Sequence, residues 1–222
     1  MKILDIPQAG KRGVTVSQGG RFGQISRILA IPANPQTEDQ LLIRNYLDLS
    51  ATHWRVLTEE QRLAWIAKAA TMQSQPVLGQ SGPLTGLMLY TKLNCTLQLL
   101  GEATIDDVPA DPEFVANTVT GLTITNTAGV IAIKLAADTA LMDLSMVRGS
   151  PPQSAGIYKC SNFRYLGIPG APSAGFIVIT TMYTQQFGVP PVGSRVFVQV
   201  NQTHHGYQDI PHKFNALVPA AA

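Results

Sequence analysis

Residues 34–70 read NPQTEDQLLIRNYLDLSATHWRVLTEEQRLAWIAKAA, and two helix starts of the same kind lie within them. Thr37 precedes Gln40 by three positions, and Thr58 precedes Gln61 in the same way. A hydroxyl side chain followed three residues later by Glu or Gln is the capping-box pattern. The spacing predicts one helix over residues 38–54 and a second over residues 59–70.

Both expected helices carry apolar residues at helical spacing. The inner face of the first helix is expected to comprise Ile43, Tyr46, Leu47, Ser50 and Trp54. That of the second is expected to comprise Leu63, Ile66, Ala67 and Ala70. The chain has two tryptophans, Trp54 and Trp65, and both lie here. We interpret them as core anchors of a helical hairpin; the alternative is a pair of rings that stacks on a ligand.

A third helix is expected over residues 86–100. Its apolar stripe consists of Tyr90, Leu93, Leu97 and Leu100, and Gly101 follows as a stop signal. We expect this helix to pack on the first two, which gives a helical domain over residues 34–104. An acidic, proline-bearing stretch over residues 105–116 is then expected to be a linker.

From Val119 onward the apolar period changes to two, which indicates strands. Residues 119–125 and 130–135 flank a turn at residues 126–129 and predict a hairpin. Further strands are expected over residues 141–147, 157–165, 176–183, 195–200 and 213–217. Seven short strands over about 100 residues are typical of an immunoglobulin-like or fibronectin type III-like β-sandwich, with a small barrel as the alternative. The predicted fold class is therefore α+β, with the sandwich over residues 117–222.

Residues 1–33 are basic and interrupted by glycines, which predicts an extended arm without helix. We expect the arm to become ordered by adding a strand to another subunit or by lying along one. The alternative is an unordered terminus. The residues expected to mediate assembly are Arg12, Val14, Val16, Arg21, Phe22, Ile25, Arg27 and Leu29.

Charge is sparse and unevenly distributed. Charged residues make up 14% of the chain, against about 25% in an ordinary soluble domain, which suggests that much of the surface meets other protein. Residues 1–36 carry five basic and one acidic side chain, residues 37–116 five basic and ten acidic, and residues 117–222 six basic and three acidic. A basic arm beside an acidic helical part favours head-to-tail contact between copies. The arm's charge alone is weak evidence for nucleic-acid binding.

No catalytic motif or cofactor-binding glycine fingerprint occurs in the sequence, so we expect neither an enzyme nor a cofactor. His204, His205 and His212 are not expected to bind metal, because adjacent histidines on a strand point to opposite faces. Cys95 and Cys160 are expected to be reduced and at least partly buried. The tyrosines of the β part could line a carbohydrate-binding face, the alternative being packing at strand edges; they are Tyr158, Tyr165, Tyr183 and Tyr207.

The sequence also predicts the compartment. The first residues lack the apolar core of a secretory signal, and no apolar run is long enough to span a membrane. We therefore expect the protein to be made in the cytoplasm and to have no membrane partner.

Four further motifs are Arg21–Gln24, Asn34–Thr37, Trp54–Trp65 and Gly86–Asn94. Together they resemble a largely uncharacterised family of proteins encoded by tailed phages, prophages and bacteria. The family pattern is a glycine-rich basic start, an Asn-Pro-x-Thr … Leu-Thr-x-x-Gln-Arg-x-Ala-Trp helical centre and a fibronectin-like tail. The resemblance covers about residues 10–112 by motif and implies a structural part of a virion or other surface assembly. It supplies no catalytic residues.

These observations lead to three hypotheses about function. The first is a virion structural protein of a tailed phage, a minor or decoration protein on the capsid, that contacts other virion proteins or copies of itself. The second is a subunit of a self-assembling filament or tube linked by exchange of the arm. The third is a carbohydrate-binding surface module.

Overall fold

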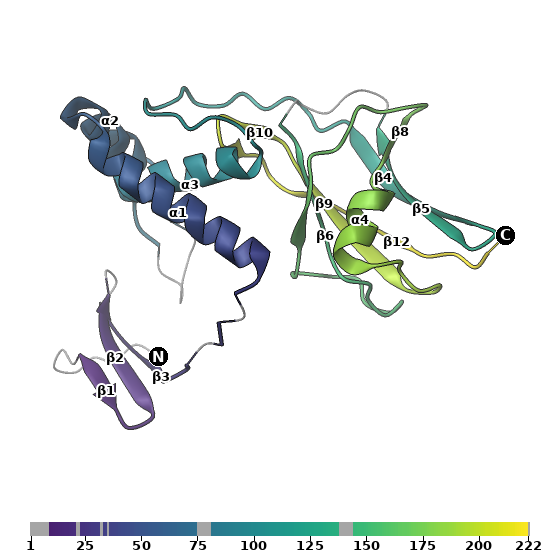
Figure 1. Ribbon diagram of the computed structural model, residues 1–222, viewed down its shortest axis with the longest axis horizontal. Coiled ribbons are helices and arrows are strands. Elements are labelled where there is room, and N and C mark those ends of the chain that lie inside the picture. The colour runs from purple at the N-terminus through teal and green to yellow at the C-terminus, as the bar shows by residue number, and fades with distance from the viewer. Residues whose placement is uncertain are drawn as a thin grey trace.

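The structure, a computed structural model, describes residues 9–20, 23–31, 33–34, 36–74, 81–137 and 144–221. The chain forms an N-terminal sheet, a helical unit and a β unit (Figure 1). This confirms the predicted α+β class, since helices and antiparallel sheets occupy separate parts of the chain. Within the described residues, no helix is both long and apolar enough to cross a membrane.

The N-terminal sheet consists of β1 (Gly10–Arg12), β2 (Thr15–Gly20) and β3 (Gly23–Ile28), which pair antiparallel in that order. The predicted extended arm is therefore a small meander over its described part. Figure 1 shows this sheet apart from the other two units, joined to them by an extended segment. None of its residues with a described burial is buried within the chain.

The helical unit contains α1 (Glu38–Val56), α2 (Glu59–Ala70) and α3 (Gly86–Leu99), so all three predicted helices are confirmed. Threonine side chains cap each of them at Thr37, Thr58 and Thr85. The reciprocal capping box forms only at Thr58, where Gln61 accepts from the Thr58 backbone. Both α1 and α2 pack on α3, which is the central helix.

The helical core differs from the predicted one. Trp65, Tyr90, Leu93 and Leu97 are buried, as expected, and Tyr46 and Trp54 are half-buried. The prediction is wrong for Ile43, Leu47 and Leu63, which are 40%, 45% and 57% exposed. It is also wrong for the rest of the predicted α2 face, since Ile66, Ala67 and Ala70 are exposed. The face of α2 that is buried carries Trp65 and Ala69, because turning the large indole inward removes more apolar area from water.

The β unit has two antiparallel sheets. The four-stranded sheet has the order β12-β9-β6-β7 and consists of β6 (Met146–Gly149), β7 (Arg164–Gly167), β9 (Arg195–Asn201) and β12 (His212–Leu217). The three-stranded sheet has the order β4-β5-β8 and consists of β4 (Val119–Thr127), β5 (Val130–Ala137) and β8 (Phe176–Val178). Residues of both sheets, among them Ile133, Ile177 and Val198, meet in one apolar core.

The predicted hairpin and the strands near residues 195–200 and 213–217 are confirmed. Two other strand predictions are wrong in part. Residues 176–183 form β8 followed by helix α4 (Thr180–Phe187), in which Tyr183 and Phe187 are one helical turn apart and turn their rings together toward the core. Residues 157–163 are irregular, and only β7 forms in that region. The strand expected over residues 141–147 begins at Met146, and residues 141–143 lie outside the described residues.

Candidate assembly surfaces

The N-terminal sheet has two different faces, which the pairing register defines. Lys11, Val16 and Arg27 lie in one row across the three strands. Cross-strand partners share a face and alternate residues change face. Val16, Ile25 and Leu29 therefore lie on one side with the two cations, and we call this side the apolar face of the sheet. Val14 lies in the turn between β1 and β2. The opposite side carries Arg12, Thr15, Ser17, Ser26 and Ile28.

Six of the eight predicted arm residues can thus be placed. Four share the apolar face, Arg12 lies on the other side, and Val14 lies in the turn between β1 and β2. Arg21 and Phe22 lie outside the described residues. Residues 9–31 contain no acidic side chain, and no described ion pair involves Lys11, Arg12 or Arg27. The sheet therefore presents uncompensated positive charge beside its aliphatic side chains.

Helix α1 is poorly covered by the rest of the chain. Ser50 is its one buried residue, whereas six of its large aliphatic side chains are 40–79% exposed. These are Leu41, Leu42, Ile43, Leu47, Leu49 and Val56. Single exposed aliphatic residues are normal, but a concentration of them on one helix is typical of a protein contact surface.

A groove of about 480 Å³ runs beside the N-terminal half of α1. One wall is formed by Asp39, Leu42 and Ile43 of α1, and the other by Tyr165 and Leu166 of β7. β7 is the last strand of its sheet, so its outer edge has no strand partner among the described residues. We call this feature the α1–β7 groove. Glu38 and Asp39 form the acidic first turn of α1, and neither takes part in a described ion pair.

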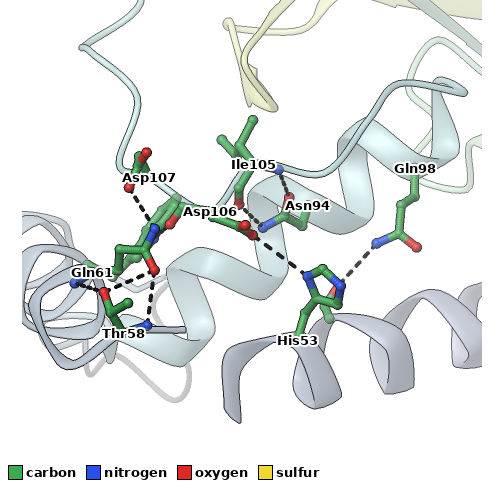
Figure 2. Close-up of polar contacts among 10 residues, drawn as sticks. His53, Thr58, Gln61, Asn94, Gln98, Ile105, Asp106 and Asp107 are labelled. Carbon is green, nitrogen blue, oxygen red and sulfur yellow. Dashed lines mark hydrogen bonds and ion pairs between the residues drawn. The ribbon is translucent and has the colours of Figure 1, made fainter. Parts of the chain in front are cut away.

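Residues 105–114, expected as part of a linker, instead form a strap along the helical unit (Figure 2). The indole N–H of Trp65 donates to the carbonyl oxygen of Asp106 at 2.7 Å, and Gln61 Nε2 donates to Asp107 Oδ1 at 2.9 Å. The Asn94 side chain makes two hydrogen bonds to the backbone of Ile105. The strap therefore joins α2 to α3 and holds the Gln61 cap in place.

Polar contacts also fix α1 against the rest of the helical unit. Gln98 Nε2 on α3 donates to the buried Ser50 hydroxyl on α1 at 3.1 Å. His53 Nδ1 lies 3.7 Å from Asp106 Oδ1 (Figure 2). These contacts hold the inner side of α1, so its exposed aliphatic residues are presented on a fixed helix.

The β unit is joined to the helical unit by a hairpin that the sequence analysis missed. It consists of β10 (Thr203–His204) and β11 (Tyr207–Gln208). Tyr207 is buried in the helical core with Leu57, Trp65 and Leu93, and Gln208 Nε2 donates to Thr96 Oγ1 at 3.4 Å. Both walls of the α1–β7 groove are therefore parts of one packed body. The Gly206 turn was the signal in the sequence that could have indicated this hairpin.

The tyrosines of the β unit do not form a common exposed face. Tyr183 and Tyr207 are buried, and the Tyr183 hydroxyl donates to the Ser150 carbonyl oxygen. Tyr165 is half-buried, and Tyr158 lies under the Arg195 guanidinium, 4.4 Å from the ring centre. Tyr183 and Tyr207 are therefore packing residues and cannot belong to a carbohydrate-binding face, which leaves Tyr158 and Tyr165 as the rings that solvent can reach.

The ionisable groups of the helical core are held in their neutral forms. Burial, together with the negative charge of nearby Asp106, raises the pKa of Tyr90 to about 12. Burial also raises the pKa of the Cys95 thiol. Cys95 and Cys160 are both free and half-buried, which confirms the expectation for the cysteines. These groups are therefore protonated at neutral pH and pack as uncharged side chains.

The adjacent histidines depart from the expected geometry. The rings of His204 and His205 contact each other, with centroids 4.1 Å apart, because His205 lies in the turn with a φ of 49°. Among the described residues, no three His, Cys, Asp or Glu side chains gather into a group that could hold a metal ion.

Comparison of the chain with protein-family models, with curated proteins and with solved structures finds no match.

Proposed function

We propose that this protein is a virion structural protein of a tailed phage, a minor or decoration protein on the capsid, and that its N-terminal sheet attaches it to neighbouring proteins. The observation that carries the proposal is the amphipathic sheet, whose aliphatic side chains find no buried place within the chain. An isolated small sheet is only marginally stable in water. Burial of its apolar face on another protein would supply the missing stabilisation.

Two further features support an assembly role. The low charge content and the poorly covered α1 fit a surface that meets other protein. The motif resemblance to phage-encoded proteins supports an assembly on a virion. In this proposal the β unit is an immunoglobulin-like or fibronectin-like sandwich that projects from the particle, and its two sheets around one core are compatible with that architecture.

The test is binding to particles. Purified phage capsids that lack the protein are mixed with the full chain or with a chain that begins at Pro32, and bound protein is measured after sedimentation through a cushion. The full chain is expected to co-sediment and the shortened chain to remain in the supernatant. Equal binding by both would overturn the attachment role, and binding by neither would overturn the capsid location.

The second candidate function is a subunit of a filament or tube. It is favoured by the presence, on one chain, of an unburied amphipathic sheet and an exposed apolar helix. A contact between two different surfaces of identical copies either closes into a ring or continues without limit. Open-ended polymers of the purified full chain that do not bind capsids would favour this candidate over the capsid protein.

A further inference from the structure

We infer that the occupant of the α1–β7 groove is the N-terminal sheet of a second copy of this chain. The inference rests on the proposed function in assigning the sheet to assembly, and it goes further by naming the partner and the surface. The apolar face of the sheet would cover Leu42 and Ile43, and its cations would lie near the acidic first turn of α1.

The two surfaces match in apolar character. The sheet presents three aliphatic side chains on one side, and the groove has two aliphatic side chains on its α1 wall and a third, Leu166, on its β7 wall. The three side chains of the sheet and Leu166 are half-buried, whereas Leu42 and Ile43 are 42% and 40% exposed. Contact between them would remove apolar area on both sides from water.

They also match in charge. In the sheet, Val16 lies between two cations, Lys11 on one neighbouring strand and Arg27 on the other. Asp39 lines the groove and Glu38 precedes it in the first turn of α1, and neither takes part in a described ion pair. Arg164, the cation on the other wall, lies against the Phe187 ring, 5.8 Å from its centre. Opposite charges placed this way would fix the orientation of the contact and raise its association rate.

A second copy is a better occupant than the chain's own sheet. In the single chain the sheet stands away from α1 (Figure 1). Residues 29–37 connect the sheet to α1, and nine extended residues can span about 30 Å. This segment is long enough to reach a neighbouring copy while both bodies keep their folds.

The experiment is a complementation test on the full-length chain. The donor variant carries Val16→Asp and Ile25→Asp, which place charge on the apolar face of the sheet and leave the groove intact. The acceptor variant carries Leu42→Asp, which places charge in the groove and leaves the sheet intact. Sedimentation velocity at rising concentration should show self-association of the wild type, a shift of at least tenfold to higher concentration for either variant alone, and a discrete one-to-one complex when the two variants are mixed.

Matched controls are available in both elements. Ile28→Asp alters the opposite face of the same sheet, where the side chain is 75% exposed. Leu41→Asp alters the residue next to Leu42, which does not line the groove. Both controls should associate like the wild type. If they lose association as fully as the donor and acceptor variants, the assigned surfaces are wrong.

A charge exchange gives a second test that leaves the apolar contact intact. Arg27→Glu and Asp39→Lys should each weaken association, and an equal mixture of the two variants should associate more strongly than either alone. The inference is overturned if association recovers neither when the donor and acceptor variants are mixed nor when the two charge variants are mixed. It is also overturned if the wild type stays monomeric at all concentrations. The particle-binding result is independent of this test. If the chain is monomeric but still needs its first 31 residues to bind capsids, the proposed function stands and the second copy is excluded as the partner of the sheet.

Discussion

Gly206 lies so close to Leu93 that a Cβ atom on Gly206 would be 2.5 Å from the Leu93 carbonyl oxygen. Gly206 forms the turn between β10 and β11 with a φ of 81°, a conformation that favours glycine. The turn therefore rests directly on the backbone of α3, and Tyr207 follows it into the helical core. This contact joins the β unit to the helical unit and so fixes the two walls of the α1–β7 groove.

Substitution Gly206→Ala is expected to lower the free energy of unfolding by about 2–4 kcal/mol, because the added methyl group meets backbone and the left-handed conformation becomes strained. Urea unfolding followed by tryptophan fluorescence measures this. Gly129→Ala is the matched control, since Gly129 has a φ of 85° but nothing within 4 Å of its added Cβ. The control should lose about 1–2 kcal/mol, and equal losses in both variants would contradict the close contact.

Trp65 and Leu63 test which face of α2 is buried. Trp65→Ala should lower the free energy of unfolding by about 3–5 kcal/mol, because it empties a fully buried site and removes the hydrogen bond to Asp106. Leu63→Ala should change it by less than about 0.5 kcal/mol, since that side chain is largely exposed. Urea unfolding followed by circular dichroism compares the two variants. If Leu63→Ala lowers the free energy of unfolding more than Trp65→Ala does, the buried face of α2 is the one predicted from the sequence.

Thr58 caps α2 with a reciprocal pair of hydrogen bonds to Gln61. Thr58→Ala should cost about 1 kcal/mol of stability, because a backbone N–H at the helix start loses its acceptor. Thr58→Ser keeps the hydroxyl and should remain close to the wild type in thermal unfolding. If the Ala and Ser variants have the same unfolding temperature, the capping box contributes nothing.

Asp209 makes stability depend on pH. Burial raises the pKa of its carboxyl group above the ordinary value of about 3.9, although the N–H of Gln202 and the nearby His212 act against the shift. The folded chain therefore holds this proton more tightly than the unfolded chain does. Protonation of Asp209 therefore adds to the free energy of unfolding. This contribution is fully present below about pH 3.9, the pKa in the unfolded chain, and is lost as the pH rises through the raised pKa of the folded chain.

Asp209→Asn removes this titration and keeps an oxygen that can accept from Gln202. The decline in free energy of unfolding from pH 3.5 to pH 7 should therefore be smaller in the variant than in the wild type. Asp48→Asn, on the exposed side of α1, should follow the wild-type curve. Parallel curves for Asp209→Asn and the wild type would show that burial of Asp209 does not govern this pH range.

The elements that could be predicted from the sequence are those set by local chemistry. The Thr58–Gln61 pair defines the start of α2, and the stripe through Tyr90 and Leu93 defines the buried side of α3. Helix α4 could not be predicted, because its β-branched residues favour a strand while tertiary packing of Tyr183 and Phe187 selects the helix.

The candidate site was predicted only in part. The arm residues were identified from their pattern, but their separation onto two faces depends on strand register. Periodicity assigned Ile43 and Leu47 to the core because it identifies an apolar face of a helix without indicating which of its residues another element covers. The groove escaped prediction because its walls come from residues more than 100 positions apart.

The central claim is that the N-terminal sheet mediates assembly between copies. Light scattering behind size exclusion, on the full chain and on a chain that begins at Pro32, tests it most directly. We predict that the mass of the full chain rises with concentration while the shortened chain stays monomeric. Equal masses for the two chains at every concentration would contradict the claim.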